Sequence, residues 1–342
     1  MFIFSPLFII RCRKRLGCIR PLQNTMTALL FTLPLLISAE PGRQPLCIIT
    51  SLQPAYSIAL NLVKNTPIEI VYIPAEDCGM EDQSAYFKEA YHTESFKKIA
   101  LKADAVLTLK SIWKNDPLYT YTALHNIFAV PLDIAEPLNP AIAGVSTLKI
   151  PTAREGFEAG RFSAGNGEVL PSIWLSLSNG AKMTEIIADS LIRMAPAYRP
   201  AIQNNRDNYL RHITALQTEY EEKLLEADIG SVALLSPDYI YLTGNFNLYV
   251  SDYLFKDGYD YTKADLMTLQ NLIVSGGTEI FIASSASETI VSCITESGGI
   301  YIELEALSSP VPVEGTPADI YLSVMRHNLE SLYQAALILK KM

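Results

Sequence analysis

The chain has 342 residues, of which 49% are hydrophobic and 18% charged, so it can bury a large apolar interior and is not compositionally disordered. Its 36 acidic residues outnumber its 27 basic ones, and five of the basic residues lie in the first 39 positions, which hold no acidic residue. The remaining chain is strongly acidic and has no basic stripe, so no nucleic-acid partner is expected.

The first 39 residues are predicted to be a secretory signal peptide. Residues 26–39 form a short apolar run that ends in Ile37-Ser38-Ala39, and a basic cluster precedes it. The run is too short to span a bilayer, and Met26 is an alternative start position. We therefore expect a mature protein that begins near Glu40 and lies in the periplasm or on the cell surface.

Four short apolar runs in the first half are predicted to be strands. They are rich in β-branched residues and cover residues 47–51, 68–73, 105–109 and 127–131, with helices expected at 55–64 and 96–102. Strands that are apolar on both faces and alternate with helices indicate a parallel sheet covered on both sides. This pattern predicts an N-terminal lobe over residues 40–178.

A helical region is predicted over residues 179–227, with helices at 179–194 and 197–227. At 1.5 Å per residue the second helix would be about 45 Å long, which is more than one lobe requires. Its apolar residues recur at helical spacing and form one stripe. The stripe consists of Ile202, Tyr209, Ile213, Leu216, Tyr220 and Leu224. We interpret this helix as a rigid link between two lobes.

The strand pattern then returns and predicts a C-terminal lobe over residues 228–342. Strands are expected at 231–235, 248–251, 279–283 and 300–304, and helices at 263–274, 287–297 and 318–340. The predicted fold class is α/β, with two lobes that each hold a mostly parallel sheet flanked by helices. Two such lobes on an exported chain are typical of a receptor that closes on a ligand.

Several segments, in order, resemble the substrate-binding proteins of zinc and manganese ABC transporters. They are TSLQPAY at 50–56, YIPA at 72–75, IALKADAVL at 99–107, IWLSL at 173–177 and the closing helix at 321–337. The resemblance implies a monomeric extracytoplasmic receptor that carries a divalent metal ion, zinc or manganese, to a membrane permease and its ATPase. It implies no catalysis, and the catalytic motifs GxSxG and HExxH do not occur.

The metal ligands that the resemblance implies are altered in this chain. The family's three usual histidines fall on Met80, Ser172 and Pro237, which precedes Asp238, and its final carboxylate falls on Glu305. Carboxylates in the loop after the second strand, including Asp82, add oxygen donors that suit hard ions such as manganese. The metal site is therefore predicted at Glu305, Asp238, Met80, Ser172 and Asp82. None of the four histidines is expected to complete it.

An alternative is that the chain is a paralogue that no longer binds metal. It would then bind an organic ligand or a protein partner in a structural or adhesive role at the surface. The missing histidines favour this alternative. A group of tyrosines lies between Asp238 and Thr262, and aromatic rings with hydroxyl tips are common in pockets for organic ligands, but packing is the favoured interpretation of this group. The family framework, present from end to end, favours metal transport.

Overall fold

The computed structural model describes residues 45–74, 78–158, 169–256, 260–308 and 319–341. The predicted signal peptide lies outside these residues, and residues Gln44–Met342 form one compact unit. Within the described ranges, no helix combines the length and apolarity needed to cross a bilayer.

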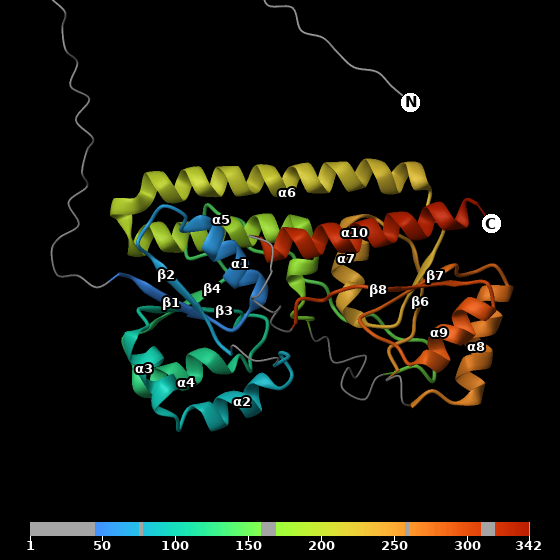
Figure 1. The fold of residues 1–342 in the computed structure, drawn as a ribbon, viewed down its shortest axis with the longest axis horizontal. Coiled ribbons are helices and arrows are strands. Elements are labelled where there is room, and N and C mark those ends of the chain that lie inside the picture. The colour runs from blue at the N-terminus through green and yellow to red at the C-terminus, as the bar shows by residue number, and fades with distance from the viewer. Residues whose placement is uncertain (1–44, 75–77, 159–168, 257–259, 309–318, 342) are drawn as a thin grey trace, which may run out of the picture. The chain divides into compact units, whose positions relative to one another are not determined.

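Lobe one is built on a sheet of four parallel strands in the order β2-β1-β3-β4 (Figure 1). Its strands are β1 (Cys47–Thr50), β2 (Glu69–Tyr72), β3 (Ala105–Thr108) and β4 (Val130–Asp133), and its helices are α1 (Gln53–Leu62), α2 (Gln83–Ala90), α3 (Glu94–Lys102) and α4 (Pro117–His125). Every residue of β1 and β3 is buried. The predicted parallel sheet is confirmed.

The two faces of this sheet pack into different apolar clusters, as a period of two along each strand requires. Ile48 and Leu107 pack on the side of α1, whereas Ile49 and Val106 pack against Phe87, Phe96 and Leu118 of α2, α3 and α4. Figure 1 shows α2, α3 and α4 together on the side of the sheet opposite α1. Helices therefore cover both faces of the sheet.

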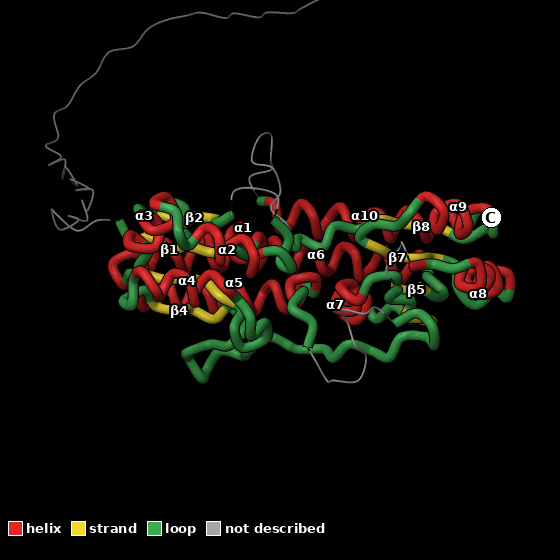
Figure 2. Tube along the Cα trace, turned by 90° about the horizontal axis from the view of Figure 1, so that it is seen from below, coloured by secondary structure: helices red, strands yellow, loops and turns green. Residues whose placement is uncertain are grey.

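Lobe two repeats this arrangement with the parallel strand order β6-β5-β7-β8. Its strands are β5 (Val232–Leu234), β6 (Val250–Tyr253), β7 (Ile280–Ala283) and β8 (Ile300–Glu303), and its helices are α7 (Ile240–Asn245), α8 (Lys263–Val274), α9 (Glu288–Glu296) and α10 (Ile320–Leu339). Phe281 packs against residues of α8 and α9, and Ile280 and Ile282 face the cluster that includes α10. In Figure 2 the strands of both lobes lie between helices.

One long helix, α6 (Arg199–Ala227), lies along both lobes in Figure 1. It contacts α5 (Leu177–Met194), α1 and α10, which lie on the same side of it in Figure 1. All six residues of the predicted stripe are buried. The stripe belongs to one apolar cluster that contains Ile48 of lobe one and Val232 of lobe two. The predicted fold, two α/β lobes joined by a long helix, is confirmed.

The finer division into residues 40–178, 179–227 and 228–342 stays a prediction. Part of the first range contacts lobe two: the backbone N–H of Arg154 donates to the carbonyl of Tyr253 at 2.8 Å, and its side chain forms an ion pair with Asp252. Phe157 packs in the cluster of α8 and α9. The chain thus reaches lobe two before it enters α5.

The predicted start of the fourth strand is wrong by three residues. Strand β4 begins at Val130, and the side chains of Ile127 and Phe128 are 78% and 84% exposed. The cause is Asn126, whose side-chain amide donates to the carbonyls of Ala100 and Ala103 in and after α3, at 3.0 and 2.8 Å. This contact holds the end of α4 against α3, so the next two residues form a turn.

Candidate metal site at the junction of the lobes

Three loops at the carboxyl ends of strands carry four of the five predicted ligands, Met80, Asp82, Asp238 and Glu305. In parallel sheets all carboxyl ends share one edge, where ligands usually bind. The loops are residues 78–82 after β2, residues 236–239 after β5 and residues 304–308 after β8, and we call them the junction loops. The backbone N–H of Met80 donates to the carbonyl of Ser308 at 3.1 Å, so the first and third loops touch across the two lobes. Met80 and Glu305 therefore come from opposite lobes to one junction.

Ser172 and Asp238 form a hydrogen-bonded pair, although 66 positions separate them in the chain. The Ser172 hydroxyl donates to Oδ1 of Asp238 at 2.8 Å, and the Ser236 hydroxyl donates to Oδ2 at 2.8 Å. Ser172 is 2% exposed and directly precedes the 3-10 turn Ile173–Leu175. The pair offers carboxylate and hydroxyl oxygens, the donor atoms that hard cations prefer.

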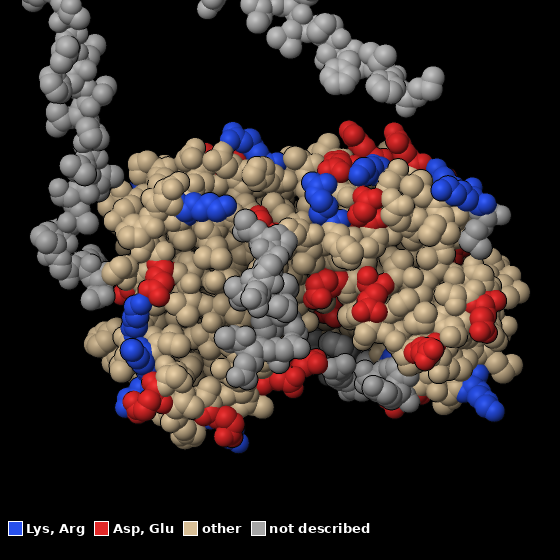
Figure 3. Space-filling view, in the orientation of Figure 1, with Lys and Arg blue, Asp and Glu red and all other residues tan. Residues whose placement is uncertain are grey.

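Tyr239 connects this pair to the loop of Glu305. Its side chain is buried, and its hydroxyl donates to the carbonyl of Leu304. Burial raises the pKa of Tyr239, and the negative charges of Asp238 and Glu305 raise it further, although a hydrogen bond with Ser284 opposes the shift. Two carboxylates thus act on one buried phenol. In Figure 3, acidic side chains (red) gather near the place where the lobes meet.

The side chain of Glu305 is exposed, and its Oε1 accepts a hydrogen bond from the backbone N–H of Leu307 at 2.9 Å. Leu307 is 1% exposed and has a φ of 56°. A left-handed backbone is rare for a leucine, so the loop makes a tight turn directly after the predicted ligand.

The five predicted ligands are not all brought together by the structure. Met80 is half-buried and packs against the main apolar cluster. Asp82 is exposed at the start of α2, and no contact connects its carboxylate to the other four residues. Across the described part of the chain, no group of three or more histidine, cysteine, aspartate or glutamate side chains is placed to hold a metal. Ligation by these residues stays a prediction.

The four histidines lie at the surface or against the ring of another aromatic residue. His92, His212 and His327 are exposed. The Nε2 of His125 lies 3.0 Å from the backbone carbonyl oxygen of Tyr91, and its imidazole stacks on the Tyr91 ring with the ring centroids 4.6 Å apart. Residues 75–77, which include two further acidic residues of the predicted loop, lie outside the described residues.

The tyrosines of lobe two act mainly in packing. Tyr239 and Tyr241 are almost fully buried, and the hydroxyl of Tyr241 donates to the carbonyl of Leu170 at 3.1 Å and accepts from the backbone N–H of Leu148 at 2.9 Å. Tyr249, in contrast, is 69% exposed. Tyr239 and Tyr241 are therefore packing residues, and Tyr259 of this group lies outside the described residues.

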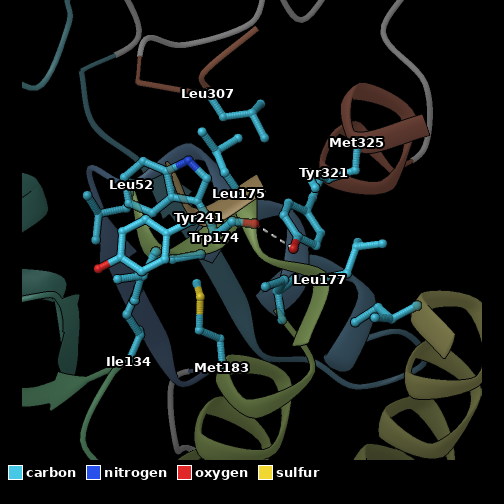
Figure 4. Packing of buried hydrophobic residues seen from close by; sticks show 14 of the residues in the cluster. Leu52, Ile134, Trp174, Leu175, Leu177, Met183, Tyr241, Leu307, Tyr321 and Met325 are labelled. Carbon is cyan, nitrogen blue, oxygen red and sulfur yellow. Dashed lines mark hydrogen bonds between the residues drawn. The ribbon is translucent and has the colours of Figure 1, made fainter. Parts of the chain in front are cut away.

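Three residues that the sequence analysis did not single out build the frame behind the junction loops. The indole N–H of Trp174 donates to the carbonyl of Ala306 at 2.7 Å, and the hydroxyl of Tyr321 donates to the carbonyl of Trp174 at 2.8 Å (Figure 4). The third, Asn328, is fully buried and bonds to the backbone of Glu305. Its signal in the sequence is a polar side chain at an apolar position of the last helix.

Comparisons with known proteins agree with this architecture. Residues 82–335 match the family described as "Zinc-uptake complex component A periplasmic". A metal ABC transporter substrate-binding lipoprotein of Streptococcus cristatus is 24% identical over 171 residues, or 48% of this chain and 55% of the relative. The zinc-binding lipoprotein AdcA of Streptococcus pneumoniae is 25% identical over 167 residues, or 48% of this chain and 33% of that protein. The chain thus spans about half the length of the curated relatives it matches, or less.

Solved structures share the fold. The substrate-binding protein FpvC of Pseudomonas aeruginosa in complex with Mn²⁺ has a TM-score of 0.62 and 22% identity, with 86% of this chain and 99% of that chain covered. Zn(II)-bound AdcA of Streptococcus pneumoniae has a TM-score of 0.62 and 18% identity, with 85% and 58% covered. Since the family match covers more than half of its length, the chain belongs to the family of periplasmic zinc-uptake complex component A proteins.

Proposed function

We propose that this chain is the extracytoplasmic substrate-binding protein of a metal-ion ABC transporter. Its cargo is a divalent cation of the zinc and manganese class, which it binds at the junction loops and delivers to a membrane permease driven by an ATPase. It works as a monomer in the periplasm or at the cell surface. The observation that carries the proposal is that buried Tyr239, next to Asp238 in the chain, donates to the carbonyl of Leu304, next to Glu305, in a loop that contacts Met80 of the opposite lobe.

The proposed ligands are Glu305, Asp238, Met80, Ser172 and Asp82. A cation at this place would interact favourably with the negative charges of Asp238 and Glu305. Carboxylate and hydroxyl oxygens select hard ions, so we expect manganese to bind more tightly here than it does at a site of three histidines. The thioether of Met80 adds one soft donor from lobe one.

The test is calorimetric titration of the purified, metal-stripped chain with Mn²⁺ and Zn²⁺. Replacing Glu305 by alanine is expected to weaken binding more than tenfold, because it removes a charged ligand. Glu296→Ala is the matched control, since Glu296 is an exposed glutamate at the end of α9, outside the junction loops. Equal affinity for Glu305→Ala and the unmodified protein would contradict the assignment of this ligand.

A second candidate function is the paralogue without metal binding, which acts through a protein or organic partner. It is favoured by the lack, among the described residues, of a three-member cluster of metal-binding side chains. A ligand that binds only the folded state raises the melting temperature. Failure of manganese, zinc, iron and calcium alike to raise that temperature would favour this second function.

A further inference from the structure

The loop from Leu304 to Ser308, which carries Glu305, is held by side chains and backbone from several other parts of the chain. The carbonyl of Leu304 accepts from Tyr239, that of Ala306 accepts from Trp174, and that of Ser308 accepts from the backbone of Met80. Together with the bond between Leu307 and Glu305, these contacts leave no residue of the loop without a hydrogen bond. The loop is therefore placed by residues far from it in sequence.

Asn328 holds Glu305 itself, and it does so at two points. The backbone N–H of Glu305 donates to Oδ1 of Asn328 at 3.0 Å, and Nδ2 of Asn328 donates to the carbonyl of Glu305 at 2.8 Å. Asn328 is 0% exposed and lies in α10 among buried residues such as Met325 and Leu329. A buried amide must find partners, and both ends of this one bind a single residue.

Two bonds to one residue fix the rotation of its backbone as well as its position. This matters because the turn that follows needs Leu307 in a left-handed conformation, which costs free energy for a leucine. Without the two hydrogen bonds from Asn328, the loop would lower its free energy by relaxing the left-handed turn at Leu307. The carboxylate of Glu305, two residues earlier, would then lose its direction.

We propose that Asn328 is a positioning residue that sets the direction of the Glu305 carboxylate and thereby the affinity for the divalent cation. The inference rests on the proposed function, in which Glu305 binds the ion. Asn328 does not itself touch the cation, because both ends of its amide are bonded to the Glu305 backbone. Residues that orient metal ligands typically change affinity on the order of 10- to 100-fold when they are replaced.

The test compares Asn328→Ala with a matched control, Asn205→Ala, by titration of the metal-stripped chain with Mn²⁺. Asn205 lies in α6 and donates to the carbonyls of Leu62 and Lys64 at 2.9 and 2.7 Å, so it also holds two backbone groups, but away from the junction loops. Asn328→Ala is expected to weaken binding about tenfold. Asn205→Ala is expected to lower the unfolding midpoint and leave the affinity unchanged.

A double variant separates positioning from general damage. If Asn328 acts through Glu305, then Asn328→Ala added to Glu305→Ala weakens Mn²⁺ binding no further. An equal loss in both backgrounds, or an unchanged affinity in the single variant, would overturn the proposal. If Asn328→Ala does not fold, Asn328→Ser keeps one hydrogen-bonding group there and is expected to show a smaller loss with the same dependence on Glu305.

Hydrogen exchange gives a readout that needs no metal. The amide of Glu305 is expected to be protected in the unmodified apo protein and to exchange faster in Asn328→Ala than in Asn205→Ala. Equal exchange rates of the Glu305 amide in the two variants would overturn the proposal that Asn328 fixes the Glu305 backbone. Absence of Mn²⁺ binding by an unmodified protein with a protected Glu305 amide would instead contradict the proposed function.

Discussion

Replacing Gly180 by alanine tests how tightly the last helix is fitted against the frame of the junction. Gly180 lies in α5, and a Cβ at this position would be 2.1 Å from the hydroxyl oxygen of Tyr321 and 2.9 Å from its Cζ. Tyr321 is fully buried and donates to the carbonyl of Trp174. Because the ring is enclosed, it cannot swing away at low cost.

Two effects of opposite sign set the size of the change. Alanine is a better helix former than glycine by about 1 kcal/mol, which would stabilise α5. Against this, overpacking costs about 1–3 kcal/mol, and displacing the Tyr321 hydroxyl leaves the buried carbonyl of Trp174 unpartnered at a further cost of about 1–3 kcal/mol. We expect Gly180→Ala to lower the free energy of unfolding by about 1–5 kcal/mol.

Urea unfolding followed by far-ultraviolet circular dichroism measures this change. Gly244→Ala is the control. Gly244 also lies in a helix, α7, and a Cβ there would meet only the Cδ1 of Leu148, at an ordinary van der Waals distance of 3.6 Å. In a Tyr321→Phe background the closest clash is absent, so Gly180→Ala should cost less there. A Gly180→Ala variant as stable as the unmodified protein would refute the reasoning.

Three other changes test the site and the stability of lobe two. Lys256 and the backbone N–H of Thr262 lower the pKa of Asp265 to about 2. The ionised carboxylate therefore adds about 2 kcal/mol to the free energy of unfolding above pH 4, and this contribution disappears as the pH falls through 2. The urea midpoints of Asp265→Asn and the unmodified protein should differ at pH 7 and converge near pH 2. Ser172→Ala removes a donor to Asp238 and should weaken Mn²⁺ binding about fivefold in calorimetry, the equivalent of one hydrogen bond. His212→Ala removes an exposed imidazole, and a change in Mn²⁺ affinity of more than twofold would contradict the exclusion of histidines from the site.

The long helix and the sheets could be predicted because their signals are local. A stripe at helical spacing buries the same residues wherever the helix packs, and α8 begins and ends at the predicted residues. The start of β4 could not be predicted in this way. Ile127 and Phe128 read as strand residues, and only the contact of Asn126 with two carbonyls of another helix turns them out to solvent.

Part of the arrangement of the candidate site followed from the sequence, while metal binding by its residues stays a prediction. The resemblance to the family placed one ligand position at Ser172 and another at Pro237, next to Asp238, and the structure joins Ser172 to Asp238 by a hydrogen bond. The role of Asn328 leaves little trace in the sequence, because its partner is the backbone of Glu305, and every residue has a backbone. A polar side chain in an apolar stripe shows that a partner exists, but the pairing across 23 positions appears only in three dimensions.

One apolar cluster runs without a break from lobe one through α6 to lobe two. We therefore expect the two lobes to unfold together when the protein is heated. Neither lobe can unfold without exposing apolar residues of the other lobe in the shared cluster. We therefore expect one calorimetric peak for residues 45–341 rather than two separate ones. Damage to either half then lowers the temperature at which both are lost. On the proposed function, a cation bound at the junction loops would therefore stabilise both lobes.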